Sequence, residues 1–336
     1  MSVNTRTKLK LDVWKGDWGL PSIDLDCLRF MTYIKFSGLE LEVNATSNPF
    51  WAPDGKLPVL RLNTKNITKY EDLVQYITSR DSNPDHGLSN KQQGEIEAFT
   101  SLMKEKLYPA LQYVCWIDAK NSNGVIRPWY SKAIPFPFSF YYPGQMATNA
   151  QEMITTLYEN IELDKDIEAK VYSDAQKCLT TLSVRLGDND FMFGAHPTSI
   201  DATMFAFLAP LLKAPLQNVS LQNHLKACPN LHHFVSRINQ RYYSKDYYDY
   251  ENKRKEEAKS QQHKDSEFPH KTRNQLLAVL FAAIAMFSYA LHAGIVEIPN
   301  GWKFWFNQGF DLVPSDIHLM LLWDWKKMPR KIEIIP

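Results

Sequence analysis

The sequence is poor in cysteine and has no excess of charge of either sign. Its four cysteines lie far apart in the 336-residue chain, no two form a Cys-x-x-Cys pair, and no histidine completes a zinc-ligand spacing beside them. This pattern argues against a disulfide framework or a zinc module, and scattered thiols fit a reducing compartment. Lys and Arg number 38 against 37 Asp and Glu. A balanced chain lacks the basic footprint of a nucleic-acid-binding protein, so nucleic acid is not expected as a partner.

Signatures of common catalytic chemistry are also missing. The chain contains no HExxH motif, no phosphate-binding Gly-rich loop and no paired-carboxylate or Ser-His-Asp order. His224, His232 and His233 have no acidic or Cys companions at ligand spacing, so we interpret them as surface or core residues. No metal site is therefore expected. The segment 1–16 carries basic residues without an apolar run, so no secretory signal peptide is expected either.

One long apolar run stands out near the C-terminus. The stretch from Leu276 to Val296 contains no Asp, Glu, Lys or Arg. As an α-helix it would span about 31 Å, close to the hydrocarbon thickness of a bilayer. Apolar residues lie on every face of this helix, where a surface helix of a soluble domain would show a single stripe. We therefore interpret 276–296 as a single transmembrane anchor, with a fully buried core helix as the alternative.

The segments flanking the run agree with an anchor. Residues 250–275 are almost entirely polar, which predicts a linker, and Pro299 ends the helix on the other side. Lys271 and Arg273 precede the run and favour an orientation with the bulk of the chain in the cytosol. The remaining residues, 299–336, form a Trp-rich tail that can lie on the membrane surface or pack against a partner.

The hydrophobic period divides the rest of the chain into two domains. Near the N-terminus, apolar residues first alternate and then recur at helical spacing, and the resulting order of strand, helix, strand, strand and helix predicts an α+β unit. From Ser89 onward the period is helical, with Ser89 and Gln92 as a capping box. The pattern predicts strands at 9–13, 39–43 and 57–62, and helices at 22–36 and 69–77.

Two local motifs sharpen this division. The run from Gly55 to Leu60 reads G-K-L-P-V-L and resembles the segment in which thioredoxin-like domains place a cis proline, here Pro58, before the third strand. Thr198 and Asp201 predict a capping box ahead of an apolar helix. Their order and separation resemble those of glutathione transferases. The resemblance implies a thioredoxin-like domain over residues 8–80 and a helical, transferase-like domain over residues 88–246.

The residues that such an enzyme needs are not evident. In glutathione transferases a Tyr, Ser or Cys near the first strand activates the glutathione thiol, and a Glu/Gln-Ser pair binds its γ-glutamyl end. Ser22 and Cys27 are the candidates near the first position, and we interpret them as a helix cap and a core residue. Lys69 and Tyr70 occupy the second position, where a lysine repels the ligand's ammonium group. We expect no catalytic residue and no cofactor.

Further segments resemble a narrower family. They are W-I-D-A-K-N at 116–121, an aromatic and proline-rich block at 129–144, and shorter stretches at 18–26 and 47–49. Together they resemble the metaxins, transferase-like proteins of the mitochondrial outer membrane. The resemblance implies a non-catalytic scaffold that works with a second metaxin and the β-barrel channel of the sorting and assembly machinery in inserting β-barrel proteins. The alternatives are a tail-anchored enzyme with residual glutathione chemistry and a mitochondrial transport adaptor.

The block from Trp129 to Tyr142 is the candidate partner surface. Its prolines predict a rigid, non-helical segment, and its aromatic side chains are of the types enriched at interface hot spots. In an extended segment Phe136, Phe138 and Phe140 would point to one side and Tyr141 to the other. Packing of the block on its own domain is the alternative. The hypothesis is that some of Trp129, Phe136, Phe138 and Tyr141 contact a second metaxin or the barrel channel.

Overall fold

The structure is a computed structural model that describes residues 8–46, 52–53, 55–62, 65–159, 164–245, 248–249, 252 and 271–292. The stretch 47–49, most of the predicted linker, the anchor end at Val296 and the Trp-rich tail lie outside the described residues. The chain divides into two compact units, Met1–Ser260 and Gln261–Pro336. The described strands are β1 (Leu9–Trp14), β2 (Leu41–Thr46), β3 (Val59–Arg61) and β4 (Asn66–Ile67).

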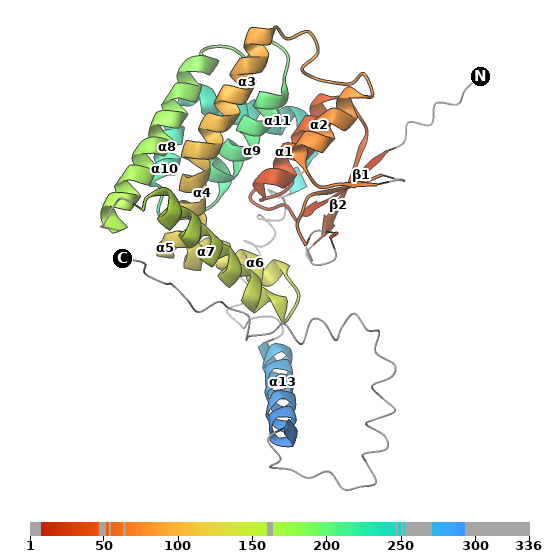
Figure 1. Ribbon diagram of the computed structural model, residues 1–336, viewed down its shortest axis with the longest axis vertical. Helices are drawn as coiled ribbons and strands as arrows, with labels where there is room; N and C mark the ends of the chain where they lie inside the picture. Colours follow the sequence, from red (N-terminus) through yellow and green to blue (C-terminus); the bar gives the residue numbers. More distant parts are fainter. Residues whose placement is uncertain are drawn as a thin grey trace, which may run out of the picture. The chain divides into compact units, whose positions relative to one another are not determined.

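The four strands form one sheet in the order β2-β1-β3-β4. β1 pairs with β2 in parallel and with β3 antiparallel, and β3 pairs antiparallel with β4. Leu9, Leu11 and Val13 are buried on one face of β1, and Asp12 and Trp14 on the other face are buried too, because β1 is an inner strand of the sheet. Helices α1 (Leu25–Phe36) and α2 (Tyr70–Thr78) pack beside this sheet (Figure 1). The predicted thioredoxin-like arrangement is thus confirmed.

Several details of this domain differ from the sequence prediction, and one is that β3 spans Val59–Arg61 where a strand at 57–62 was predicted. The helix predicted from residue 22 begins at Leu25, because Asp24 is the N-cap and its side chain accepts a hydrogen bond from the Cys27 amide. β2 runs two to three residues further along the chain than predicted. β4 was not predicted, because two residues are too short for a detectable alternation. The peptide bond between Leu57 and Pro58 is cis.

The helical domain is built around one buried helix. In α9, every residue from Ser199 to Leu212 except Pro210 is buried, so the helix is covered on all sides. α1 packs against α9, which joins the two domains. The other helices surround it (Figure 1). They are α3 (Asn90–Leu102), α4 (Tyr108–Gln112), α5 (Ala119–Asn121), α6 (Arg127–Ala133), α7 (Phe138–Leu157), α8 (Asp164–Leu186), α10 (Ser220–Lys226) and α11 (Pro229–Tyr242), with α9 spanning Ser199–Lys213.

The two capping boxes expected from the sequence are present. Ser89 caps α3 together with Gln92. Thr198 caps α9 together with Asp201, whose Oδ2 accepts hydrogen bonds from the Thr198 amide at 2.8 Å and the Thr198 hydroxyl at 2.7 Å. Asp201 Oδ1 also accepts from the Met192 amide at 2.8 Å. The box therefore starts the central helix and ties the preceding loop to it.

The segment from Trp129 to Tyr142 is helical except at residues 134–137, so the prediction of a non-helical segment was wrong for most of its length. α6 covers its first part, and α7 begins at Phe138 and continues through Pro143. Pro143 has no amide hydrogen to offer the carbonyl of Ser139 one turn earlier. The Ser131 hydroxyl donates to that carbonyl at 3.4 Å. A side chain from the preceding helix thus satisfies the acceptor that proline leaves free.

The second unit contains one described helix, α13 (Lys271–His292). It covers the predicted anchor from Leu276 to His292. Among the helices of the described residues, none has the length and apolarity needed to cross a membrane.

Candidate functional site

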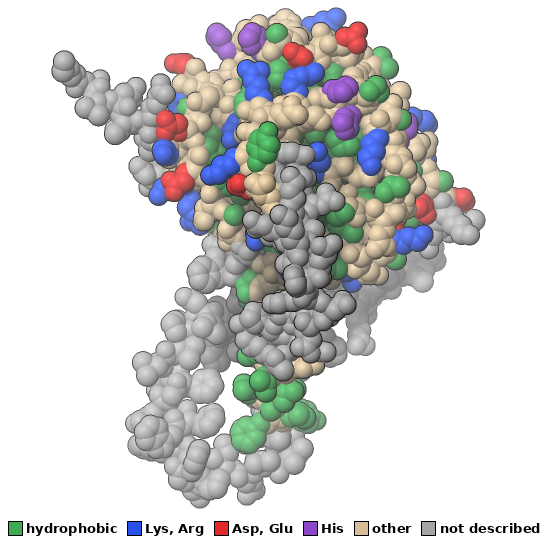
Figure 2. Space-filling model, turned by 180° about the vertical axis from the view of Figure 1, so that it is seen from behind, with side chains coloured by type: hydrophobic (Ala, Val, Ile, Leu, Met, Phe, Trp, Pro, Cys, Tyr) green, Lys and Arg blue, Asp and Glu red, His purple; other side chains and the backbone are tan. Residues whose placement is uncertain are grey.

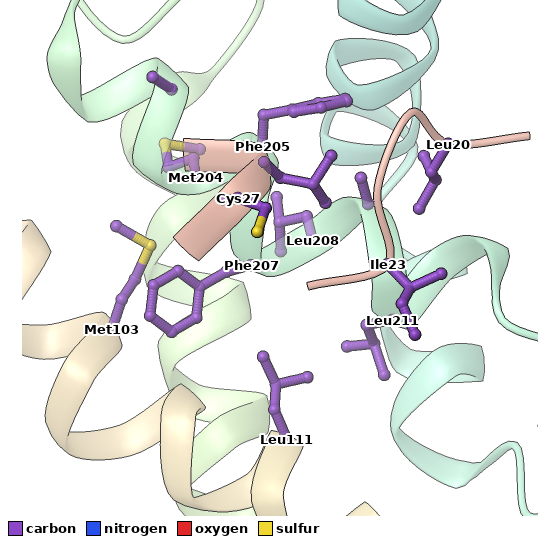
Figure 3. Packing of buried hydrophobic residues seen from close by; sticks show 14 of the residues in the cluster. Leu20, Ile23, Cys27, Met103, Leu111, Met204, Phe205, Phe207, Leu208 and Leu211 are labelled. Atoms are coloured by element: carbon purple, nitrogen blue, oxygen red, sulfur yellow. The ribbon is translucent and has the colours of Figure 1, made fainter. Parts of the chain in front are cut away.

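The position expected for thiol chemistry, where β1 leads into α1, is closed. Ser22 is fully buried, and its hydroxyl accepts a hydrogen bond from the Asp24 amide at 3.3 Å. Cys27 is fully buried as well, and its Sγ accepts from the Trp14 amide at 3.5 Å. Figure 3 shows the Cys27 side chain directed toward Phe207 and Leu208 of α9. Both candidate nucleophiles are therefore buried and engaged by neighbouring backbone amides.

The electrostatics of Cys27 oppose activation. Burial, followed by the nearby Asp24 carboxylate, raises the pKa of the Cys27 thiol well above its ordinary value. An activated cysteine needs the reverse, because the thiolate is the nucleophile and a positive neighbour normally stabilises it. Burial and the neighbouring Asp26 also raise the pKa of Asp24 itself to about 6. This end of α1 disfavours any additional negative charge.

The position expected to hold the γ-glutamyl end is occupied by the protein itself. Lys69 is the N-cap of α2 and makes no side-chain capping hydrogen bond. The Tyr70 side chain is buried, and the Arg29 guanidinium lies over its ring at 3.5 Å from the centroid. Arg29 Nε also donates to the Thr203 hydroxyl of α9 at 2.9 Å. These residues join α1, α2 and α9 and do not present a Glu/Gln-Ser pair.

An aromatic cluster closes the same region from the side of α6 and α7. The Tyr130 ring lies 5.3 Å from Trp14 of β1, 5.2 Å from Trp116 and 5.8 Å from Tyr142, measured between centroids. Tyr142 also contacts Trp14 at 5.5 Å. Such edge and tilted contacts stabilise a cluster beyond the burial of area alone. The cluster fixes α6 and α7 onto the end of β1.

Trp129 adds a polar contact to this junction. Its Nε1 donates a hydrogen bond of 2.8 Å to Asp17 Oδ2, and its ring lies 6.5 Å from that of Trp18. Asp17 also accepts from the Trp18 amide at 2.8 Å through its other carboxylate oxygen. Trp129 is half-buried. Its contacts in the structure are therefore internal.

The other aromatic residues of the block divide into two groups. Phe138 is half-buried and packs against the core. Phe136, Phe140 and Tyr141 are 46%, 79% and 61% exposed, and the rings of Phe136 and Phe140 meet edge to face at 6.0 Å. We call these three residues the exposed aromatic patch. Phe140 was not among the predicted partner residues; helical spacing from Phe138 onward, instead of alternation, would have identified it.

The W-I-D-A-K-N segment is a brace inside the helical domain. Asp118 accepts from the Lys120 and Asn121 amides at the start of α5, and from Asn218 Nδ2 at 2.6 Å. Asn121 is fully buried, and its Oδ1 accepts from the Gln217 and Asn218 amides, each at 2.8 Å. The segment thus holds the loop between α9 and α10. In the part of the chain that the structure describes, no cluster of His, Cys, Asp and Glu could hold a metal ion.

These features define a class of protein. A thioredoxin-like sheet is joined to a helical domain as in glutathione transferases, and its own buried side chains fill the positions of glutathione chemistry. A family model for the glutathione S-transferase C-terminal domain matches residues 175–238, and another, described as an outer mitochondrial membrane transport complex protein, matches residues 27–147. The chain is 40% identical to mouse metaxin-1 over 86% of its length and 92% of the mouse protein.

The chain belongs to the metaxin family. It is also 37% identical to metaxin-3 of Xenopus laevis over 71% of its length and 78% of the frog protein. Among solved structures, apo glutathione S-transferase III is 16% identical, with a TM-score of 0.44 over 73% of this chain and 95% of that one. Membership of the metaxin family points to the mitochondrial outer membrane and its transport complex.

Proposed function

We propose that this metaxin is a non-catalytic scaffold of the mitochondrial outer membrane that takes part in protein import and in the insertion of β-barrel proteins by the sorting and assembly machinery. Its proposed partners are a second metaxin and the β-barrel assembly channel. The observation that carries the non-catalytic part is the closed thiol position, where Cys27 is fully buried and the pKa of its thiol is raised. A glutathione transferase needs an open and activating environment at this position.

The test of this part is binding of glutathione. Isothermal titration of the purified chain with glutathione should give no heat of binding above buffer, and conjugation of a standard electrophilic substrate should stay at the uncatalysed rate. Cys27→Ala and Ser22→Ala serve as variants. Micromolar binding or measurable conjugation that either substitution abolishes would restore the enzyme interpretation.

We further propose that the exposed aromatic patch contacts a partner. Large apolar side chains at 46% to 79% exposure are rare enough on a monomer to mark an interaction surface when they adjoin one another. The aromatic cluster behind the patch holds α6 and α7 rigidly, so little side-chain and backbone freedom is lost on binding. Trp129 and Phe138, which were also candidates, are half-buried and make internal contacts.

Single alanine substitutions separate contact from support. Phe140→Ala and Tyr141→Ala should reduce co-purification of partners in mild detergent and change the free energy of unfolding by less than about 0.5 kcal/mol. Phe138→Ala should lower the free energy of unfolding by about 1 to 3 kcal/mol, since only part of that ring is buried. Val184→Ala is the matched control, because Val184 is 78% exposed on α8. Unchanged co-purification in both patch variants would move the partner surface elsewhere.

The attachment to the membrane is proposed from the sequence. We propose that residues 276–296 anchor the chain in the outer membrane, with the bulk of the chain facing the cytosol. The run contains no Asp, Glu, Lys or Arg from Leu276 to Val296, and this supports the proposal. Ala285→Arg places a charge near the middle of the run at a cost of about 2.5 to 3.5 kcal/mol. The variant should be released by carbonate extraction; continued resistance would contradict a simple anchor.

A further inference from the structure

The last long helix of the first unit, α11, carries charge of one sign. Between Asp201 and Asp246 the chain contains no Asp or Glu, although its acidic and basic residues are otherwise nearly equal in number. His232, His233 and Arg241 of α11 are exposed. Lys226 at the end of α10 is exposed as well. We call these four residues the basic face.

The charges of this face lie close together in space. The pKa of His232 is lowered, first by burial and then by the positive charges of His233, Lys213 and Lys226. These residues come from three helices, α9, α10 and α11. The tertiary fold therefore brings together charges that are separated along the sequence. Figure 2 shows Lys, Arg and His side chains across the upper part of one side of the molecule, with Asp and Glu side chains among them. Asp190 is the acidic neighbour of this region, and it pairs with Arg237 at 3.1 Å.

A hollow opens on the same helix. It has a volume of about 540 Å³ and is lined by His233, Ser236, Arg237, Gln240 and Arg241. Each of these side chains can donate hydrogen bonds and none is acidic. A concave surface of donors with positive charge suits the oxygens of a phosphate group, because charge-assisted hydrogen bonds to phosphate are stronger than neutral ones.

We propose that the basic face docks on the phosphate headgroups of the anionic membrane surface to which the chain is anchored. This inference rests on the proposed anchor. α11 ends at Tyr242, and residues 250–275 then lead to the anchor. Residues 243–275 separate α11 from the anchor, and at no more than about 3.5 Å per residue they keep the face within ~115 Å of the bilayer. Basic residues held near an anionic leaflet are attracted to it, and tethering raises their effective concentration.

The experiment uses the full chain reconstituted in lipid nanodiscs. One set contains phosphatidylcholine alone, and the other contains about one third anionic phospholipid. Diethyl pyrocarbonate modifies exposed histidines, and mass spectrometry measures its rate at His232 and His233. His196, which is exposed elsewhere, is the internal reference. We expect the rate at His232 and His233 to fall about fivefold in anionic discs, to recover at ~1 M salt, and to stay constant at His196.

Charge variants decide whether the basic face causes the effect. In Lys226→Glu with Arg241→Glu, the protection should disappear. The double variant Lys91→Glu with Lys177→Glu makes the same change of net charge at exposed positions on α3 and α8. In this control variant His232 and His233 should stay protected. Equal rates in both discs, or salt-insensitive protection in neutral discs, would overturn the inference and leave the anchor intact. Failure of the chain to co-fractionate with either disc would overturn the proposed anchor and the inference with it.

Discussion

Replacing Asn121 by alanine should destabilise the helical domain strongly, because this fully buried side chain holds the loop between α9 and α10. The substitution removes an acceptor that binds the Gln217 and Asn218 amides at 2.8 Å each, and a donor that binds the Asn218 carbonyl at 3.2 Å. A backbone group left without its partner costs about 1 to 3 kcal/mol when buried. Gln217 is exposed and Asn218 is half-buried, so water can replace part of the loss. We expect Asn121→Ala to lower the free energy of unfolding by about 2 to 4 kcal/mol.

Urea unfolding of the unit 1–260, followed by far-UV circular dichroism, measures this cost. Asn123→Ala is the control, because Asn123 is exposed two residues further on and should change stability by less than about 0.5 kcal/mol. If Asn121→Ala is as stable as the wild type but loses partners on co-purification, the W-I-D-A-K-N segment is a contact motif. The interpretation of it as an internal brace would then be wrong.

Three further predictions follow from the same structure. Cys27 should resist alkylation by iodoacetamide at pH 8 in the folded chain while the half-buried Cys228 reacts, and peptide mapping after unfolding should show both modified. Burial raises the pKa of Asp201 to about 6, so the folded chain binds this proton more tightly than the unfolded chain. The free energy of unfolding of the wild type, compared with that of Asp201→Asn, should therefore rise by up to about 3 kcal/mol as pH falls from 7 to 4. A difference between the two proteins that does not change with pH would contradict the burial argument. Trp129→Phe keeps the ring packing but loses the hydrogen bond to the Asp17 carboxylate, so urea unfolding should show a loss of about 1.5 to 3 kcal/mol.

The parts of the fold that depend on neighbouring residues could be predicted from the sequence. The alternation at Leu9, Leu11 and Val13 predicted the first strand, because successive side chains of a strand point to opposite faces. The box of Thr198 and Asp201 is local in the same sense, since its hydrogen bonds join residues three apart. The start of α1 was less certain, because Ser22 and Asp24 are both good N-caps and the backbone conformation of Asp24 decided between them.

The error at the aromatic block has a tertiary cause. Proline is disfavoured inside a helix because it leaves the carbonyl of the preceding turn without its donor. In α7 the Ser131 hydroxyl supplies that hydrogen bond from α6, and Tyr142 is held against Trp14 and Tyr130. Neither contact can be inferred from the residues next to Pro143. The helix therefore forms where local propensity predicts none.

By itself, the sequence determined the order of the elements, the capping boxes, the metaxin resemblance and the lack of a Glu/Gln-Ser pair at Lys69 and Tyr70. Each of these depends on residue type and on spacing along the chain. Only the tertiary structure decided that Trp129 and Phe138 are half-buried while Phe140 and Tyr141 face solvent, and that His232 lies close enough to Lys213 and Lys226 to feel their charges. The physical reason is that exposure and the sum of charges depend on which elements pack together, and side chains from distant parts of the chain decide both.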